Sequence, residues 1–160
     1  MRVNTLALVA AIGLLVAPLA AGQDGAQRVT PGEIRWPSGA SSSVGTSGAA
    51  GIETVILKGN PGKPGLYAML LRVPPNTKIE AHAHPDDRVG TVISGIWLFG
   101  YGRAFDQSRL KALPSGSFYT EPPNENHFAM TGAEGVVLQV TGIGPSATTY
   151  VDPAHDPTRR

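Results

Sequence analysis

Residues 78–101, KIEAHAHPDDRVGTVISGIWLFGY, decide the fold of this chain. They contain three short runs rich in β-branched, aromatic and other apolar residues, separated by Pro-Asp-Asp and Ser-Gly. Short runs broken by turn residues are typical of antiparallel sandwiches and barrels. The same pattern continues on both sides, and the expected strands are 54–58, 66–73, 78–84, 90–94, 96–101, 117–121, 126–130, 136–141 and 148–151. No stretch shows a helical period, so the sequence predicts an all-β fold.

The length and composition predict one domain that is stabilised without disulfides. The chain has 160 residues, no Cys, 20 Gly and 14 Pro. We expect the barrel over residues 52–151, an N-terminal segment with a Ser/Gly-rich loop over 23–51, and a polar tail over 152–160. The stretch PSGASSSVGTSGAAG (37–51) has few large apolar side chains, which predicts a loose loop or linker.

The first 22 residues have the pattern of a secretory signal peptide. Arg2 provides a positive start, residues 6–17 are almost entirely apolar, and small residues precede the polar Gln23. The apolar run is shorter than the roughly 20 residues that span a bilayer, so no membrane span is expected. The mature protein would be periplasmic or secreted. Because its basic and acidic residues would be equal in number, we expect no nucleic-acid partner.

Three histidines form the candidate metal site. His82 and His84 lie two residues apart in an expected strand, so their side chains leave the same face. His127, in the run 126–130, is the natural third ligand. Neutral imidazoles bind Fe, Mn, Zn, Ni and Cu alike, so the expected cofactor is a divalent transition metal of unspecified identity. The alternative is an ordinary polar strand face, and His155 is expected to be exposed in the polar tail.

These segments resemble the two motifs of the cupin superfamily. The first motif places a glycine, His-x-His, a glutamate and a final glycine in order, at positions occupied here by Asn76, His82, His84, Arg88 and Gly95. The second places a glycine, Pro-x-Gly, a histidine and an asparagine, at positions occupied here by Gly116, Pro122, Asn124, His127 and Thr131. The resemblance covers roughly residues 70–151 and implies a double-stranded β-helix, or jelly-roll, cupin barrel in a single domain.

Arg88 is the main departure from the cupin pattern. The glutamate at this position is commonly a fourth metal ligand in cupins, and a guanidinium has no lone pair with which to replace it. The chain therefore resembles the three-His variant found among metal-dependent dioxygenases of the superfamily. Arg88 could hold an anionic substrate beside the metal, or it could pair with Asp86 or Asp87, or point outward.

Three further residues are candidates for the site. Glu121 could be a fourth ligand, a hydrogen-bond partner of an imidazole, or a solvated residue at the barrel mouth. Glu80 would share the face of His82, about 7 Å along the strand. Gln139 interrupts an apolar strand, and a buried amide needs partners, which either the pocket or a hydrogen bond across the barrel would provide.

The resemblance implies an exported, metal-binding cupin. The first functional hypothesis is a dioxygenase-like oxidoreductase that acts on a small oxygen-rich or anionic molecule. The alternative is a non-catalytic protein of the cell envelope that binds a metal or a small ligand; the cupin fold hosts both kinds of protein. Such domains often pair through an added N-terminal strand, so residues 34–36 would make a homodimer.

Overall fold

The structure is a computed structural model that describes residues 25–40 and 43–159. Its strands are β1 (Glu53–Lys58), β2 (Gly65–Val73), β3 (Lys78–Ala83), β4 (Arg88–Ser94), β5 (Ile96–Tyr101), β6 (Lys111–Pro114), β7 (Phe118–Glu121), β8 (His127–Thr131), β9 (Val136–Gly144) and β10 (Thr149–Tyr150). Four short 3-10 turns accompany them: η1 (Pro31–Glu33), η2 (Gln107–Arg109), η3 (Pro153–His155) and η4 (Pro157–Arg159). No α-helix occurs in the described ranges, which confirms the all-β prediction. The expected signal peptide, residues 1–22, lies outside the described residues.

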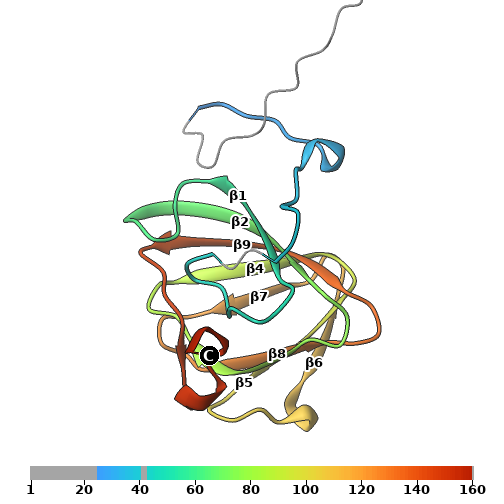
Figure 1. Cartoon of the computed structure of the whole chain (residues 1–160), viewed down its shortest axis with the longest axis vertical. Coiled ribbons are helices and arrows are strands. Elements are labelled where there is room, and N and C mark those ends of the chain that lie inside the picture. Colours follow the sequence, from blue (N-terminus) through green and yellow to red (C-terminus); the bar gives the residue numbers. More distant parts are fainter. Residues whose placement is uncertain (1–24, 41–42, 160) are drawn as a thin grey trace, which may run out of the picture.

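The strands form two five-stranded antiparallel sheets that face each other (Figure 1). One sheet has the order β1-β2-β9-β4-β7, and the other has the order β10-β3-β8-β5-β6. Nine strands correspond to the expected runs, whereas β6 was not expected because Lys111–Pro114 contains only two apolar residues before its proline. The connections between the sheets bring the ends of β3, β4, β7 and β8 together at one side of the interior.

Alternation along the strands sends one set of side chains into the space between the sheets. In β9, Leu138 and Val140 are buried core residues, and they pack with Met69 and Phe99. Gln139 lies between them in the alternation and is only partly buried. Its side chain is therefore on the outer face of the sheet, and the prediction that Gln139 lines the interior pocket is wrong.

The two asparagines at motif-glycine positions adopt the backbone that glycine usually provides. Asn76 has φ 53° and Asn124 has φ 61°. The motif glycines that remain, Gly95 and Gly116, have φ 81° and 84°. Asn tolerates the left-handed region better than most residues, so the turns of both motifs survive these substitutions.

Residues 43–52, which we call the strap, do not form the loose loop that their composition predicts. Gly45, Thr46 and Ser47 are buried, as is Ile52 at the end of the strap (Figure 1, teal, before β1). Thr148 Oγ1 donates to the carbonyl of Thr46 at 2.8 Å. The strap is fixed mainly through such backbone acceptors, which every residue has, so its side-chain composition gave no sign of burial.

The N-terminal segment packs beside the β1 edge of its own chain. Gln27 Nε2 donates to the carbonyl of Leu57 at 2.5 Å. The guanidinium of Arg72 lies over the Trp36 ring, 3.9 Å from its centroid, a cation–π arrangement. Residues 34–36 do not form a strand in the structure.

Candidate metal centre

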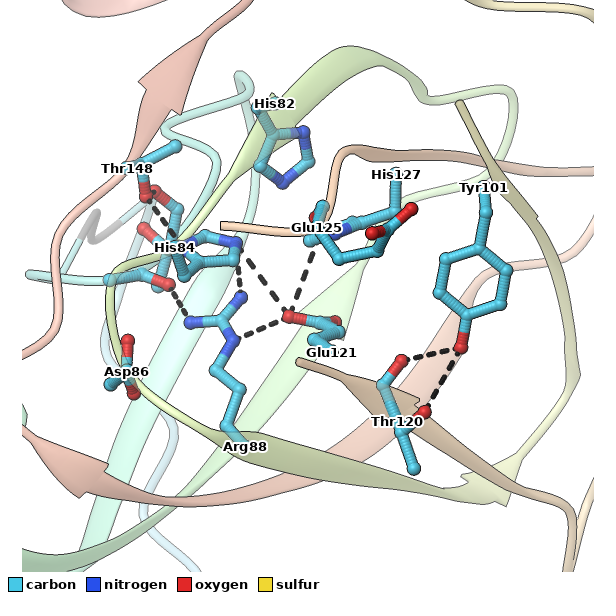
Figure 2. Close-up of polar contacts among 12 residues, drawn as sticks. His82, His84, Asp86, Arg88, Tyr101, Thr120, Glu121, Glu125, His127 and Thr148 are labelled. Carbon is cyan, nitrogen blue, oxygen red and sulfur yellow. Dashed lines mark hydrogen bonds and ion pairs between the residues drawn. The ribbon is translucent and has the colours of Figure 1, made fainter. Parts of the chain in front are cut away.

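The strand register brings the three histidines together at the ends of β3 and β8. His82 and His127 are cross-strand partners in the β3–β8 pair, and His84 follows His82 by two residues. All three are buried, with 4%, 1% and 2% of their surface exposed for His82, His84 and His127. The prediction that these side chains meet at one place inside the barrel is confirmed (Figure 2).

Backbone carbonyls fix the same tautomer in each ring. His82 Nδ1 lies 2.7 Å from the carbonyl oxygen of Glu80, and His84 Nδ1 lies 2.7 Å from that of Ala147. His127 Nδ1 lies 3.1 Å from the carbonyl oxygen of Glu125. A carbonyl can only accept, so each Nδ1 carries the proton and each Nε2 keeps a lone pair. Hydrogen bonds of this kind orient metal-binding histidines in many proteins.

The nitrogens are close enough to share one ion. One ligand atom from each ring lies within 4.8 Å of the other two. Nε2 of His127 is buried and has no hydrogen-bond partner among the described residues. Burying an unpaired acceptor is unfavourable unless something else binds it. A divalent transition metal fits this donor set, because three neutral imidazoles whose Nδ1 holds the proton can each offer Nε2 as a ligand.

Glu121 supplies a carboxylate at the same place. It is the last residue of β7, and its Oε2 lies 3.6 Å from Nε2 of His84 and 3.5 Å from Nε2 of His127 (Figure 2). Burial is the largest single influence and opposes its ionisation, but the charge of Arg88, the neighbouring histidines and the hydrogen bond from Arg88 together outweigh burial and lower the pKa of Glu121 to about 2. The residue is therefore a carboxylate directed at the histidines, not a solvated side chain at the mouth.

Arg88 points inward and pairs with Glu121. The two residues are cross-strand partners in the β4–β7 pair, and Nε of Arg88 donates to Oε2 of Glu121. Nη1 donates to the carbonyl of Gly45, and Nη2 donates to Nε2 of His84. Asp86, one of the surface partners expected for Arg88, instead accepts a hydrogen bond from the Tyr67 hydroxyl at 2.6 Å. Each guanidinium nitrogen is thus committed to a protein acceptor, which favours a positioning role over binding a substrate anion.

Glu80 does not lie with the histidines. The β3–β8 register shifts between Ile79 and His82, so three steps along β3 match two along β8. This β-bulge reverses the alternation, and Glu80 turns away from the face of His82. Its carboxylate binds Lys78 Nζ at 2.6 Å and is part exposed. The expectation that Glu80 shares the histidine face is wrong for this reason, whereas His155 is exposed as expected.

The space beside the histidines is small. Its volume is about 30 Å³, room for about one or two water molecules. The lining is mostly apolar, and the strap contributes Thr46, Ser47 and Ile52 to the wall. Nothing in the Ser/Gly-rich composition of residues 43–52 predicts this position for the strap. Only the structure reveals the contact that fixes the strap at this position: the hydroxyl of Tyr150, on β10, donates to the carbonyl of Ser47 at 2.6 Å.

Acid should destabilise the metal-free protein. Burial lowers the pKa of His82 to about 3 and also lowers the pKa of His84 and His127. The unfolded chain therefore takes up protons near pH 6.5 while the folded rings stay neutral, and stability falls as the pH falls. Below about pH 6.5, each such ring lowers the free energy of unfolding by about 1.4 kcal/mol for every pH unit. Denaturant unfolding at pH 7.5 and pH 5 would measure this, and His82→Asn should show a shallower dependence than His155→Ala.

The fold is similar to that of several solved proteins. No family model matches the chain, and no curated protein matches it either. The polyketide cyclase RemF from Streptomyces resistomycificus is 20% identical with a TM-score of 0.65, over 85% of this chain and 94% of that one. The DMSP lyase DddQ from Ruegeria pomeroyi is 18% identical with a TM-score of 0.52, over 61% of this chain and half of that one. A protein of unknown function with a cupin-like fold from Ralstonia eutropha is 19% identical with a TM-score of 0.49, over 59% and 56%.

At these identities the likeness concerns the fold. It agrees with the two facing antiparallel sheets and with the motif histidines on β3 and β8, inside the barrel. No helix within the described ranges is long and apolar enough to cross a membrane. The chain is a single-domain, all-β protein with the cupin fold.

Proposed function

We propose that this protein binds a divalent transition metal through His82, His84 and His127. The observation that carries the proposal is that one ligand atom of each ring lies within 4.8 Å of the other two, while a backbone carbonyl holds the proton of each ring on Nδ1. Glu121 is the proposed fourth ligand, since its carboxylate lies within 3.6 Å of two of these nitrogens. From the neighbouring strand β7, Glu121 would take the place of the motif glutamate that cupins commonly carry where this chain has Arg88.

We further propose that the metal serves an enzyme acting on a small oxygen-bearing molecule, with dioxygenase-like oxidoreductase chemistry as the first hypothesis. A bound metal of this kind supplies Lewis acidity to the oxygens of a substrate. The apolar lining of the barrel would exclude bulk water, and the histidines would stay neutral because burial lowers their pKa. The descriptions of RemF as a cyclase and DddQ as a lyase support an enzyme over a passive binder.

The small cavity favours a second function, a non-catalytic metal-binding protein of the cell envelope. A volume of about 30 Å³ admits no organic substrate while the strap is in place. The two functions are separated by metal analysis of protein from its native compartment, followed by oxygen-uptake screening with envelope metabolites and phenolics. Turnover that needs the metal and disappears in His84→Ala supports the enzyme. Stoichiometric metal without turnover of any compound supports the binder.

We propose that the protein is exported to the periplasm or beyond. The support is the pattern of residues 1–22, with a positive start, an apolar run and small residues before Gln23. N-terminal sequencing of protein from its native source should find Gly22 or Gln23 as the first residue. Protein that retains Met1 and fractionates with the cytoplasm would contradict export.

A homodimer is also proposed. Several large apolar side chains are exposed, among them Leu66, Ile93, Phe118 and Ile143 at 47–61%. Leu66 and Ile143 are cross-strand partners in the β2–β9 pair, and adjacent exposed apolar side chains are a feature of surfaces at which proteins associate. Sedimentation or light scattering at several concentrations would test the proposal, and a monomer at all of them would refute it.

A further inference from the structure

The strap is the part of the cavity wall that can move without breaking a sheet. The rest of the lining comes largely from strands, whose backbone groups are hydrogen-bonded to their neighbours. The strap is held by three side chains that donate to its carbonyls: Arg88 to Gly45, Thr148 to Thr46, and Tyr150 to Ser47. Segments with few such bonds open at lower free energy than sheets do.

All three of these side chains also contact the proposed metal ligands, but of the three only Arg88 is hydrogen-bonded to an Nε2 nitrogen. The guanidinium of Arg88 is planar and rigid, so its three contacts depend on one orientation. In that orientation Nη2 donates to Nε2 of His84 (Figure 2). At the same time Nη1 donates to the carbonyl of Gly45 in the strap. Arg88 therefore joins the strap to the metal site directly.

The contact with His84 cannot coexist with metal binding. Nδ1 of His84 carries the proton, because it donates to the carbonyl of Ala147. Nε2 then has a single lone pair, which either Arg88 or a metal ion can use, but not both. A dication on Nε2 would also repel the adjacent guanidinium, although Glu121 would still neutralise part of its charge.

We infer that metal binding displaces Arg88 from His84 and, through the rigid guanidinium, loosens its hold on the strap. Arg88 is a positioning residue in this scheme, because it acts on the strap and on the ligands rather than on a substrate. The inference rests on the proposed metal binding by the three histidines. Its consequence is that the cavity, which is too small for an organic molecule while the strap is in place, widens once the metal ion has bound, so that substrate follows metal.

Hydrogen–deuterium exchange of the full chain, with and without saturating Zn²⁺, tests the inference. The peptide covering the strap should exchange faster with Zn²⁺, by about fivefold if one hydrogen bond to the strap is lost. A peptide from β9 (Val136–Gly144) should exchange at the same rate or more slowly. Zn²⁺ that binds but leaves strap exchange unchanged or slower overturns the coupling alone. Absence of Zn²⁺ binding overturns the proposed function, and the coupling with it.

Coupling is reciprocal, so loosening the strap should strengthen metal binding. Tyr150→Phe removes the hydroxyl that holds Ser47 and keeps the ring that packs against His82. It should tighten Zn²⁺ binding by up to about fivefold, the equivalent of one hydrogen bond. Tyr101→Phe is the matched control, because it removes a hydroxyl that donates to the carbonyl of Thr120, away from the strap. Equal affinities in the two variants would overturn the coupling.

Discussion

Replacing His82, His84 or His127 by Ala should lower the affinity for Zn²⁺ by roughly 100-fold or more for each substitution. A structural zinc site provides about 10–16 kcal/mol through four ligands, so one ligand corresponds to roughly 3 kcal/mol. Each of the three imidazoles has its Nδ1 bonded to a backbone carbonyl, so Nε2 is the nitrogen left for the metal, which at His84 must first displace Arg88. Competition with a chromogenic chelator at pH 7.5 would measure the affinities.

His155→Ala is the control for these variants. His155 is exposed in η3, far along the chain from the motif histidines, and should bind no metal with them. The three-His site would be wrong if His155→Ala lowered the affinity for Zn²⁺ as much as His84→Ala did. It would also be wrong if all the single variants bound Zn²⁺ as tightly as the unchanged protein. Glu121→Gln provides a graded comparison, since it keeps the shape of the side chain and removes the charge of the proposed fourth ligand.

Removing the guanidinium of Arg88 should destabilise the protein by about 3–5 kcal/mol, the usual effect of leaving one partner of a buried ion pair alone. In Arg88→Met the carboxylate of Glu121 would be buried without its cation. Its pKa, which is lowered to about 2 against the effect of burial with Arg88 as the largest lowering influence, would rise. Urea unfolding at pH 7.5 would measure the change in the free energy of unfolding.

The double variant Arg88→Met/Glu121→Gln distinguishes this effect from simple loss of packing. Replacing both charges removes the unpaired carboxylate, so most of the stability should return. A double variant as unstable as Arg88→Met would show that the long side chain matters for its packing and that the ion pair does not. Retention of full stability in Arg88→Met itself would mean that the guanidinium is not buried against Glu121 in solution.

Local sequence determined the strands and the identity of the three histidines. Short alternating runs between turn residues predicted nine of the ten strands, because alternation and breakers are properties of neighbouring residues. His82 and His84 share a face for the same reason. Asn76 and Asn124 could stand for motif glycines because the left-handed backbone is an intrinsic tolerance of asparagine.

Register decided what the sequence left open about Arg88, Glu121 and Glu80. Arg88 and Glu121 are 33 residues apart, and only the pairing of β4 with β7 makes them partners. A bulge in β3 turned Glu80 outward, although simple alternation placed it beside His82. One residue of register changes the face of every side chain beyond it, and that shift depends on the neighbouring strand.

The sequence by itself therefore determined an all-β chain with three metal-binding candidates, and tertiary structure decided how the site is completed and covered. Gln139 fell on the outer face because its position in β9 is out of phase with the core residues. The strap became part of the cavity wall although its composition is that of a loop. The bonds that hold it end on backbone carbonyls, which are the same in every residue. Which carbonyl meets a buried donor is settled only when distant segments of the chain pack together.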